Sequence, residues 1–551
     1  MFKNSPTSSS YIPVQSVEVY PDAQVPHTST QNQMRFLLPQ YLGFMSPTES
    51  KLQYQLTMRG RGLPIPNSRA GAHSLFRDLR IQSGDGTTQL EEILDYNVLT
   101  AQTWGYSENQ SIADKRTMFE GRDANPSSGT SLFYTGTNDW DLAEVTTDND
   151  MKPVSVQVEM PLYSGILNSE KVFPLVATQG LRLHCNLETR ERGLVYKTGF
   201  KGSTPYATTE GLNSENVVRT AAVVPVVPAK AAEGDTFEIE LNGDDVGIDT
   251  TPNNNLPFSI GDRMWLSVDG TLGTELELGI LQSVTKTGTN CTLKISLNQP
   301  IAGAGLAGGE AVGSYVYFKS EERMNGWTPT GAVLPDLITL AQEKVEYTMT
   351  DIKYLIGTVS PPEMYVSAMM SQMNSSKGLS MDISTYSTYR NTLTAIQGLT
   401  NSLIPATQQR AYSVLSVPLN NSAQISMLAD SLAGVVDQAQ SYQYVHKNRL
   451  IPDRPVSLSK TSEGLCDQLA ILELEKALVN CNVATRNLQR IPERFLIARS
   501  FSKYGQVADL ADGTLTLRVD YSSLAEVQKM LNHYVCHLSR INITQGNVLV
   551  S

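Results

Sequence analysis

Strict alternation of apolar and polar residues is the feature that most limits what this chain can fold into. In residues 52–58 every second residue is apolar, and the pattern returns in segments spread along the chain. Successive side chains of a strand point to opposite faces of its sheet, so alternation predicts strands with one buried and one polar face. The other alternating segments are 154–160, 181–187, 237–241, 379–383 and 515–519.

These strands indicate an all-β fold. Strands with one polar face are typical of antiparallel sandwiches and barrels. No repeating order of strand, helix and strand is visible, which argues against a doubly wound α/β fold. Helical pattern is confined to short pieces. Leucines recur at helical spacing in residues 463–486, and a capping box at residues 523–526 predicts a short helix to about Leu531.

The composition favours wide protein contacts over a surface for polyanions. The 551 residues carry a formal net charge of −12, which argues against a main surface that neutralises phosphates or binds a membrane surface. Charged residues make up only 18% of the chain, and neutral polar residues replace them. With 40% hydrophobic residues, the chain has enough apolar surface to fold.

The cysteines and the N-terminal residues give expectations about the compartment. The five cysteines are far apart and form no CxxC pair, so we expect no disulfide scaffold and a reducing compartment. The first residues lack the apolar core of a signal peptide. The sequence has no run of 18 or more apolar residues, so we expect no membrane span.

Short motifs that resemble enzyme signatures occur in the wrong context. Residues 303–308 match GxGxxG, but no helix pattern and no suitably placed acidic residue follow, which favours a simple strand connection. Residues 457–460 match SxxK, and residues 286–288 and 197–199 match KTG, but their order along the chain is the reverse of that in the penicillin-binding enzymes. We interpret all of them as chance matches.

Candidate ligands for metals or nucleic acids are equally sparse. His533, Cys536 and His537 form the only dense set, but in a strand Cys536 points away from the two histidines. Asp148 and Asp150 fit a solvated loop, and the basic pair in residues 59–61 fits the turn at a strand end. We therefore predict no catalytic, cofactor-binding or metal-binding residues, and a structural or interaction protein that is not an enzyme.

The organisation along the chain suggests one arm and one insertion. Residues 1–30 are rich in Ser, Pro and Thr and predict an extended arm. Residues 196–330 are rich in Gly, Thr and Asn, with short strands at close spacing, and predict a small β unit inserted between two strands of a larger domain.

Four segments resemble the double jelly-roll major capsid proteins of icosahedral double-stranded DNA viruses, particularly those of polinton-like viruses and virophages. In the first segment, a strand ends at Pro161-Leu162, and a new strand begins at Leu181. Between them lie Phe173-Pro174-Leu175 and Ala177-Thr178-Gln179, which stand in for the family's pattern. The others are residues 74–97, which look like an early strand and the following helix, the stretch 444–456, and the C-terminal run 513–550.

The resemblance implies two tandem eight-stranded jelly rolls, over residues 31–375 and 376–551, with the 196–330 insertion as an outer tower. It implies a homotrimeric, pseudo-hexameric capsomer in the virion. Its partners would be neighbouring capsomers and the penton and minor capsid proteins, around double-stranded DNA that is enclosed but not tightly bound. Assembly would take place inside the host cell. An internal membrane and a host receptor are left open.

Two other functions remain open at this point. A viral fibre or minor capsid protein also trimerises, although no shaft repeat is visible in the sequence. A β-sandwich carbohydrate-binding protein or glycosidase would need aromatic platforms and paired carboxylates, and only four tryptophans are spread along the chain.

Overall fold

The computed structural model describes most of the chain outside the predicted arm and insertion. The described residues are 14–59, 64–67, 69–107, 119–122, 154–169, 171–196, 217–219, 236–242, 263–267, 276–287, 292–298, 315–318, 346–393, 396–421, 424, 431–435, 439–458, 468–485, 495–502, 507–525, 528–544 and 547–550.

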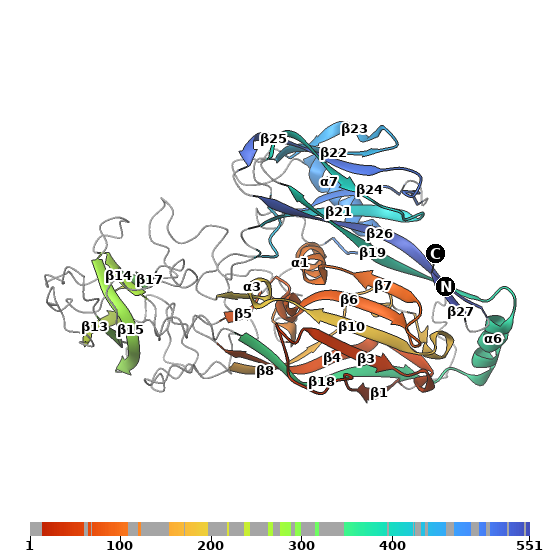
Figure 1. The fold of residues 1–551 in the computed structure, drawn as a ribbon, viewed down its shortest axis with the longest axis horizontal. Helices are drawn as coiled ribbons and strands as arrows, with labels where there is room; N and C mark the ends of the chain where they lie inside the picture. The colour runs from red at the N-terminus through yellow and green to blue at the C-terminus, as the bar shows by residue number, and fades with distance from the viewer. Residues whose placement is uncertain are drawn as a thin grey trace.

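Two β-sandwiches dominate the structure and lie one above the other in Figure 1. The sheets of the first have the strand orders β1–β18–β4–β8 and β3–β10–β6–β7. Their bounds are β1 (Val14–Val19), β3 (Gln33–Leu38), β4 (Phe44–Arg59), β6 (Phe76–Ser83), β7 (Gln89–Ile93), β8 (Val154–Met160), β10 (Leu181–Leu187) and β18 (Glu346–Val359). Two short strands, β2 (His27–Thr28) and β9 (Phe173–Pro174), join the first sheet through β18 and β4.

The second sandwich repeats this order. Its sheets run β19–β26–β21–β24 and β20–β25–β22–β23, and β27 (Asn547–Val550) pairs with β26. The strands are β19 (Leu379–Leu393), β20 (Ile396–Ile404), β21 (Ala411–Asn420), β22 (Ala439–His446), β23 (Arg449–Ser457), β24 (Ile497–Ser500), β25 (Leu515–Ala525) and β26 (Lys529–Thr544).

The pairing identifies each sandwich as a jelly roll. The eight strands in the two sheet orders of each sandwich can be numbered from first to eighth along the chain. The first strand then pairs with the eighth, the second with the seventh, the third with the sixth and the fourth with the fifth. In the second sandwich these antiparallel pairs are β19 with β26, β20 with β25, β21 with β24 and β22 with β23. In the first they are β1 with β18, β3 with β10, β4 with β8 and β6 with β7. One long hairpin rolled into two sheets gives this pattern. The prediction of an all-β fold with tandem jelly rolls is confirmed.

A separate sheet lies within the predicted insertion, between β10 and β18. Its strand order is β12–β17–β14–β15–β16–β13. The bounds are β12 (Val217–Arg219), β13 (Thr236–Asn242), β14 (Arg263–Ser267), β15 (Leu276–Thr287), β16 (Thr292–Asn298) and β17 (Tyr315–Phe318). Figure 1 shows this sheet beyond the end of the first roll at which β5 (Pro64–Pro66) lies. β5 pairs with β11 (Leu194–Tyr196).

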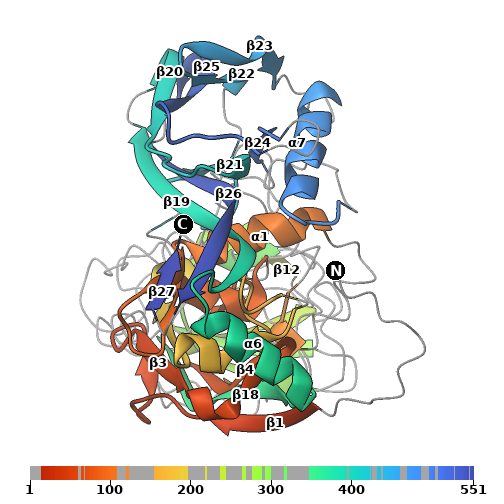
Figure 2. The ribbon, with the colours of Figure 1, turned by 90° about the vertical axis from the view of Figure 1, so that its right-hand side faces the viewer.

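The described helices are few and short, as predicted. They are the 3-10 turns η1 (Gln40–Leu42), η2 (Gly71–Leu75) and η4 (Leu175–Thr178), and the α-helices α1 (Tyr96–Ser107), α3 (Arg190–Gly193), α6 (Glu363–Asn374) and α7 (Gln468–Asn480). Figures 1 and 2 both place α1 between the two rolls and α6 at the end opposite the inserted sheet. None of the helices among these residues combines the length and apolar character needed to cross a membrane.

Two sequence predictions need correction. The helix expected from residue 523 to about Leu531 is wrong, because β25 continues to Ala525 and β26 begins at Lys529. There Ala525 pairs with Ile396 of β20, and Lys529 pairs with Leu393 of β19, so ladder pairing overrides the local capping motif. The arm expected over residues 1–30 is wrong from Val14 onward, where β1 pairs with β18; residues 1–13 lie outside the described part.

The alternation found in the sequence matches the buried face of the sheets. In β4, Leu52, Tyr54, Leu56 and Met58 are all buried, and the rings of Phe36 and Tyr354 pack in the same core at a tilt of 50°, with centroids 6.0 Å apart. The second roll has its own core between its two sheets. The apolar cluster of the first roll continues beyond that roll into the contact with β26 and α7, so the two rolls share a continuous buried region.

Candidate functional site

The joint between the two rolls is the most elaborate polar site in the described part of the chain. Here β7 and the start of α1, both from the first roll, face β19 and β26 of the second roll. β26 is buried on both faces over residues 531–536. Leu531 and Val535 belong to the core of the second roll, whereas Tyr534 and Cys536 belong to the cluster shared with the first roll.

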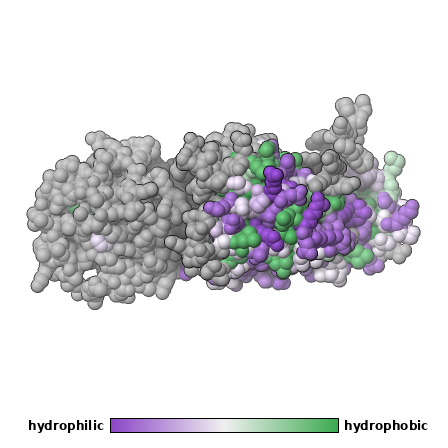
Figure 3. Space-filling view, turned by 90° about the horizontal axis from the view of Figure 1, so that it is seen from above, coloured by the Kyte–Doolittle hydropathy of each residue, from purple (hydrophilic) through white to green (hydrophobic). Residues whose placement is uncertain are grey.

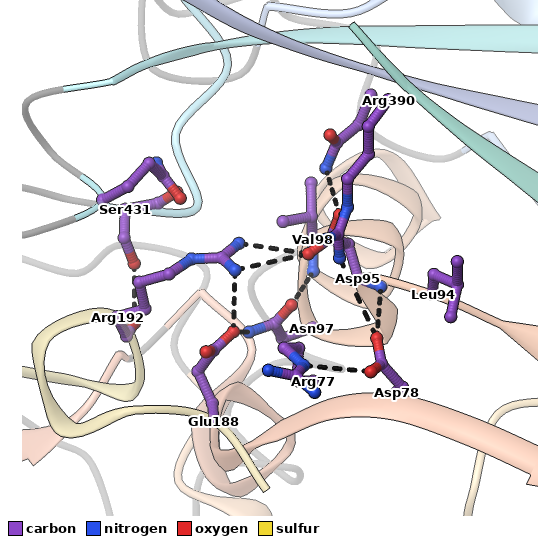
Figure 4. A network of polar contacts seen from close by, with 12 residues as sticks. Arg77, Asp78, Leu94, Asp95, Asn97, Val98, Glu188, Arg192, Arg390 and Ser431 are labelled. Carbon is purple, nitrogen blue, oxygen red and sulfur yellow. Dashed lines mark hydrogen bonds and ion pairs between the residues drawn. The ribbon is translucent and has the colours of Figure 1, made fainter. Parts of the chain in front are cut away.

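Asp95 is the centre of this joint (Figure 4). Its side chain is fully buried, and its backbone has a φ of 47°, in the left-handed region that Asp and Asn tolerate better than most residues. The carboxylate accepts hydrogen bonds from Arg390 Nε and, at 3.0 Å, from Asn532 Nδ2, both of the second roll. Tyr534 donates its hydroxyl to the Asp95 carbonyl at 2.9 Å.

The first roll contributes a second arginine to the same carboxylate. Arg192 in α3 donates from Nη1 and Nη2 to Asp95 Oδ1, both at 3.3 Å. Arg192 Nη1 also lies 3.0 Å from Glu188 Oε2, which accepts a bond of 3.0 Å from Asn97 Nδ2. Burial raises the pKa of Glu188, opposed by the charge of Arg192. The carboxylates of Asp95 and Glu188 thus meet two guanidinium groups, Arg192 and Arg390, and a buried network of this kind is stable only when its members are paired.

Glu91 of β7 makes a second polar connection across the joint. It is buried and accepts hydrogen bonds from the backbone N–H of Gly165 at 2.7 Å and of Ile166 at 3.1 Å. Thr385 of β19 donates its hydroxyl to the same carboxylate. Burial raises the pKa of Glu91, and these donors act in the opposite direction. One side chain therefore fixes β7, the loop after β8 and the second roll in a single arrangement.

Further side-chain to backbone hydrogen bonds line the joint. Gln102 of α1 donates to the Leu432 carbonyl at 2.8 Å, and Thr388 of β19 donates to the Leu94 carbonyl at 3.1 Å. Ser431 donates to the Arg192 carbonyl at 2.7 Å. These bonds are directional and come from both rolls, so they fix the orientation of one roll relative to the other.

A cleft of about 320 Å³ opens along the joint between β7 and β19. Its titratable groups already have structural partners: Glu91 accepts three hydrogen bonds, and His537 Nε2 lies 2.9 Å from Ser387 Oγ. Glu92 pairs with Arg80 at 2.6 Å. The arrangement holds strands together and offers no prepared general base at this cleft.

The structure separates the ligand set suggested by the sequence. His533 lies inside the second roll between Ser402 Oγ at 2.9 Å and Ser416 Oγ at 2.7 Å. Cys536 packs on the opposite side of β26, as the strand alternation predicts. Among the residues that the structure describes, no three His, Cys, Asp or Glu side chains are grouped to hold a metal ion.

The other motifs carry no site in the described residues. Lys286 and Thr287 are at the end of β15, Ser457 is at the end of β23, and Arg59 ends β4. Apart from Leu458, the remaining members of those motifs lie outside the described part of the chain, as do Asp148, Asp150 and residues 303–308. The prediction that the chain has no catalytic, cofactor-binding or metal-binding residues stays a prediction.

Burial of His533 predicts an acid-sensitive second roll. Burial lowers the pKa of His533 to about 3, from 6.5 for a free histidine. The folded state therefore binds fewer protons than the unfolded state, and the stability that His533 contributes is complete above pH 6.5 and is lost as the pH falls toward 3. Between pH 7 and pH 5 we expect a loss of about 2 kcal/mol from this residue.

The measurement is the free energy of unfolding in urea at pH 7, 6 and 5. His533→Gln should flatten the pH dependence over this range, whereas His446→Gln, at a partly buried histidine, should change it much less. Equal slopes in the wild type and in His533→Gln would contradict the assignment.

The chain was compared with protein-family models, curated proteins and solved structures. No protein-family model matches the sequence, and no curated protein matches it. Among solved structures, it is similar to the PBCV-1 virus capsid, with 8% identity, a TM-score of 0.49, and coverage of 100% of this chain and 99% of that chain. The Faustovirus major capsid protein has 8% identity and a TM-score of 0.46, covering 99% and 92% of the two chains. The mavirus major capsid protein has 9% identity and a TM-score of 0.36, covering 100% and 93%.

Two of these proteins, those of Faustovirus and mavirus, are major capsid proteins. Because the identities and TM-scores are low, we base the fold on the strand pairing described above.

Proposed function

We propose that this chain is a viral major capsid protein. It forms homotrimeric capsomers of pseudo-hexagonal outline, which tile an icosahedral shell around a double-stranded DNA genome. The proposal rests on one observation: two jelly rolls of the same strand order are held in a fixed orientation by a buried joint centred on Asp95. Two similar units per chain and three chains per particle give a ring of six similar units, and such a ring can tile a plane.

The joint supports this function because a tile must keep its shape. Hydrogen bonds from Asn532, Tyr534 and Arg390 to one buried residue of the first roll leave little freedom for the rolls to rotate. An enzyme or a binding protein with two domains usually places its ligand in the crevice between them. Here strands, helix α1 and a hydrogen-bonded polar network occupy the contact.

The surface supports wide, wet contacts between capsomers. Figure 3 shows the described part of one face of the molecule as mainly hydrophilic, with hydrophobic residues scattered across it. Leu399 and Leu403 of β20 are examples of exposed apolar side chains. Many weak contacts of this mixed kind suit a shell, in which each tile touches several neighbours.

The partners follow from the same proposal. They are the other two chains of the trimer, neighbouring capsomers, and the penton and minor capsid proteins. The genome is enclosed without a dedicated phosphate-binding surface, in keeping with the net charge of −12. The inserted sheet between β10 and β18 would form an outer tower, the domains would divide at residue 375, and assembly would take place in the host cell before the protein becomes part of the virion.

The carbohydrate-binding alternative gains no support at Trp104. The guanidinium of Arg122 lies 3.6 Å from the centroid of the Trp104 ring, and His73 packs against the same ring with centroids 4.5 Å apart. A sugar-binding platform needs an open aromatic face, and both neighbours occupy space around this one.

The test is the mass in solution by light scattering, with negative-stain images of the same peak. We expect about 181 kDa, three times the 60.4 kDa of the chain, and particles with a hexagonal outline. A protein that stays at 60 kDa at high concentration would contradict the proposal and lead to glycan-binding assays.

A further inference from the structure

The two rolls carry a helix at the same place in their strand order. In the first roll, α1 follows β7, the fifth strand, and precedes β8, the sixth. In the second roll, α7 follows β23 and precedes β24, again the fifth and sixth strands. The helices differ in their local packing, because α1 packs on β6 and η2, whereas α7 packs on β24 and β21. Both belong to the connection in which the chain passes from one sheet of the roll to the other.

The side of the first roll that carries α1 is covered by the second roll. Nine of the twelve residues of α1 are buried, and Gln102 reaches the Leu432 carbonyl of the second roll. Directly before the helix, Asp95 is bonded to β19 and β26. The first and eighth strands of the second roll therefore cover the side of the first roll that carries its fifth strand and following helix.

Among the described residues of the single chain, none packs over the corresponding side of the second roll. α7 buries Ala470, Leu474, Ala477 and Leu478 on the face that packs on β24 and β21, and the last three join the apolar cluster shared with the first roll. On its other face, Leu469, Leu472 and Val479 are 47%, 49% and 54% exposed. Their spacing of three and seven residues puts these apolar side chains on one stripe, which also carries the exposed Lys476. Figure 2 shows α7 along the outer side of the second roll.

The complementary surface lies on the first roll, where the described residues likewise leave it uncovered. Its first and eighth strands, β1 and β18, correspond to β19 and β26. The outward face of these strands includes Glu18 and Lys353, whose side chains form a partly exposed ion pair of 2.8 Å, and the half-buried Leu355 beside them. Within the described chain no element packs over this face of β18 as the first roll packs over β26. Each chain thus has two surfaces that correspond to the two sides of its internal joint and that no described residue covers. They are the α7 side of the second roll and the outer face of β1 and β18.

We propose that the exposed stripe of α7 docks on the outer face of β1 and β18 of a second copy of this chain. The contact repeats the internal joint between chains, with different surfaces on the two partners. Contacts of this head-to-tail type close into a ring when the rotation allows it. The inference rests on the proposed trimer and names the surfaces that would form it.

The first test is the effect of a charge on the stripe. Leu472→Glu should weaken the trimer at least tenfold, measured as the protein concentration at which light scattering shows half dissociation. Val479→Lys should do the same from the other end of the stripe. Leu399→Glu is the matched control, because Leu399 is an exposed leucine of the same roll, 60% exposed on β20, away from α7. Circular dichroism melting of the variants checks that the monomers remain folded.

The second test locates the partner surface by hydrogen exchange. The wild-type trimer should protect amides in residues 14–20 and 346–355 relative to the Leu472→Glu monomer, and should leave residues 396–404 unchanged.

The outcomes separate the two proposals. A wild type that is monomeric at every concentration overturns both. A wild-type trimer that resists Leu472→Glu and Val479→Lys, or that protects β20 in place of β1 and β18, overturns the docking surfaces and leaves the capsomer standing.

Discussion

Replacing Asp95 with asparagine should lower the free energy of unfolding by about 3 kcal/mol and uncouple the two rolls. Asn is close to Asp in size and tolerates the left-handed backbone at this position, where φ is 47°. The substitution therefore removes the negative charge with little change of shape. Arg390 and Arg192 would then face an amide group, and Arg192, whose side chain is 12% exposed, would lose one of its two carboxylate partners.

The expected size follows from the burial of the network. Removing one member of a buried ion pair leaves the other charge without compensation in a place that water does not reach, and this costs much more than the loss of a surface pair. Arg390 is 40% exposed and keeps Asp78 nearby at 3.9 Å, so the larger share of the loss should come from Arg192 and Asn532.

The measurement is urea unfolding of the wild type, Asp95→Asn and the control Asp382→Asn. Asp382 pairs with Arg540 at 2.7 Å, but it is 35% exposed and lies within the second roll, so its loss should cost less than about 1 kcal/mol. Weakening of the joint should also split the transition into two, since each roll has its own core. If Asp95→Asn is no more costly than Asp382→Asn, charge pairing does not hold the joint.

The sequence predicts the sheets better than it predicts the joint. Alternation in residues 52–58, 154–160 and 181–187 coincides with β4, β8 and β10, because each of these strands has one face in the core and one in solvent. The leucine spacing in residues 463–486 likewise locates α7. Strand alternation and helical leucine spacing are patterns among residues close together in the chain, so they can be recognised in a single sequence.

The pattern fails where an element is buried on all sides or its partners are distant. α1 shows no apolar stripe because it is enclosed by both rolls, and both faces of β26 are buried over residues 531–536. Asp95 meets Arg390 and Asn532, which are 295 and 437 residues away. No local spacing indicates that these side chains converge. The one available signal is the isolated acidic residue between a strand and a helix, which is also common at helix starts.

Replacing Gly165 with alanine should destabilise the protein by about 3 kcal/mol through the same joint. Gly165 lies in the loop after β8, where its N–H donates to Glu91 at 2.7 Å. An added Cβ would lie 2.3 Å from the carbonyl oxygen of Ser384 in β19, far inside van der Waals contact. That carbonyl belongs to a strand paired along its whole length with β26, so relief of the clash requires a shift of the strand or of the loop.

Gly513→Ala is the matched control. An added Cβ at Gly513 would meet only side-chain atoms, Lys447 Cγ at 2.9 Å and His446 Nε2 at 3.5 Å, and the lysine chain can move away. Both substitutions reduce the conformational entropy of the unfolded chain by a similar amount, which by itself stabilises by about 0.4–1 kcal/mol. The difference between the two variants in urea unfolding therefore isolates the cost of the contact with Ser384. A Gly165→Ala protein as stable as Gly513→Ala would mean that the loop yields and that the rolls are not held at a fixed distance there. A large difference, together with a weaker trimer for Gly165→Ala, would show that the spacing of the two rolls is a condition of assembly.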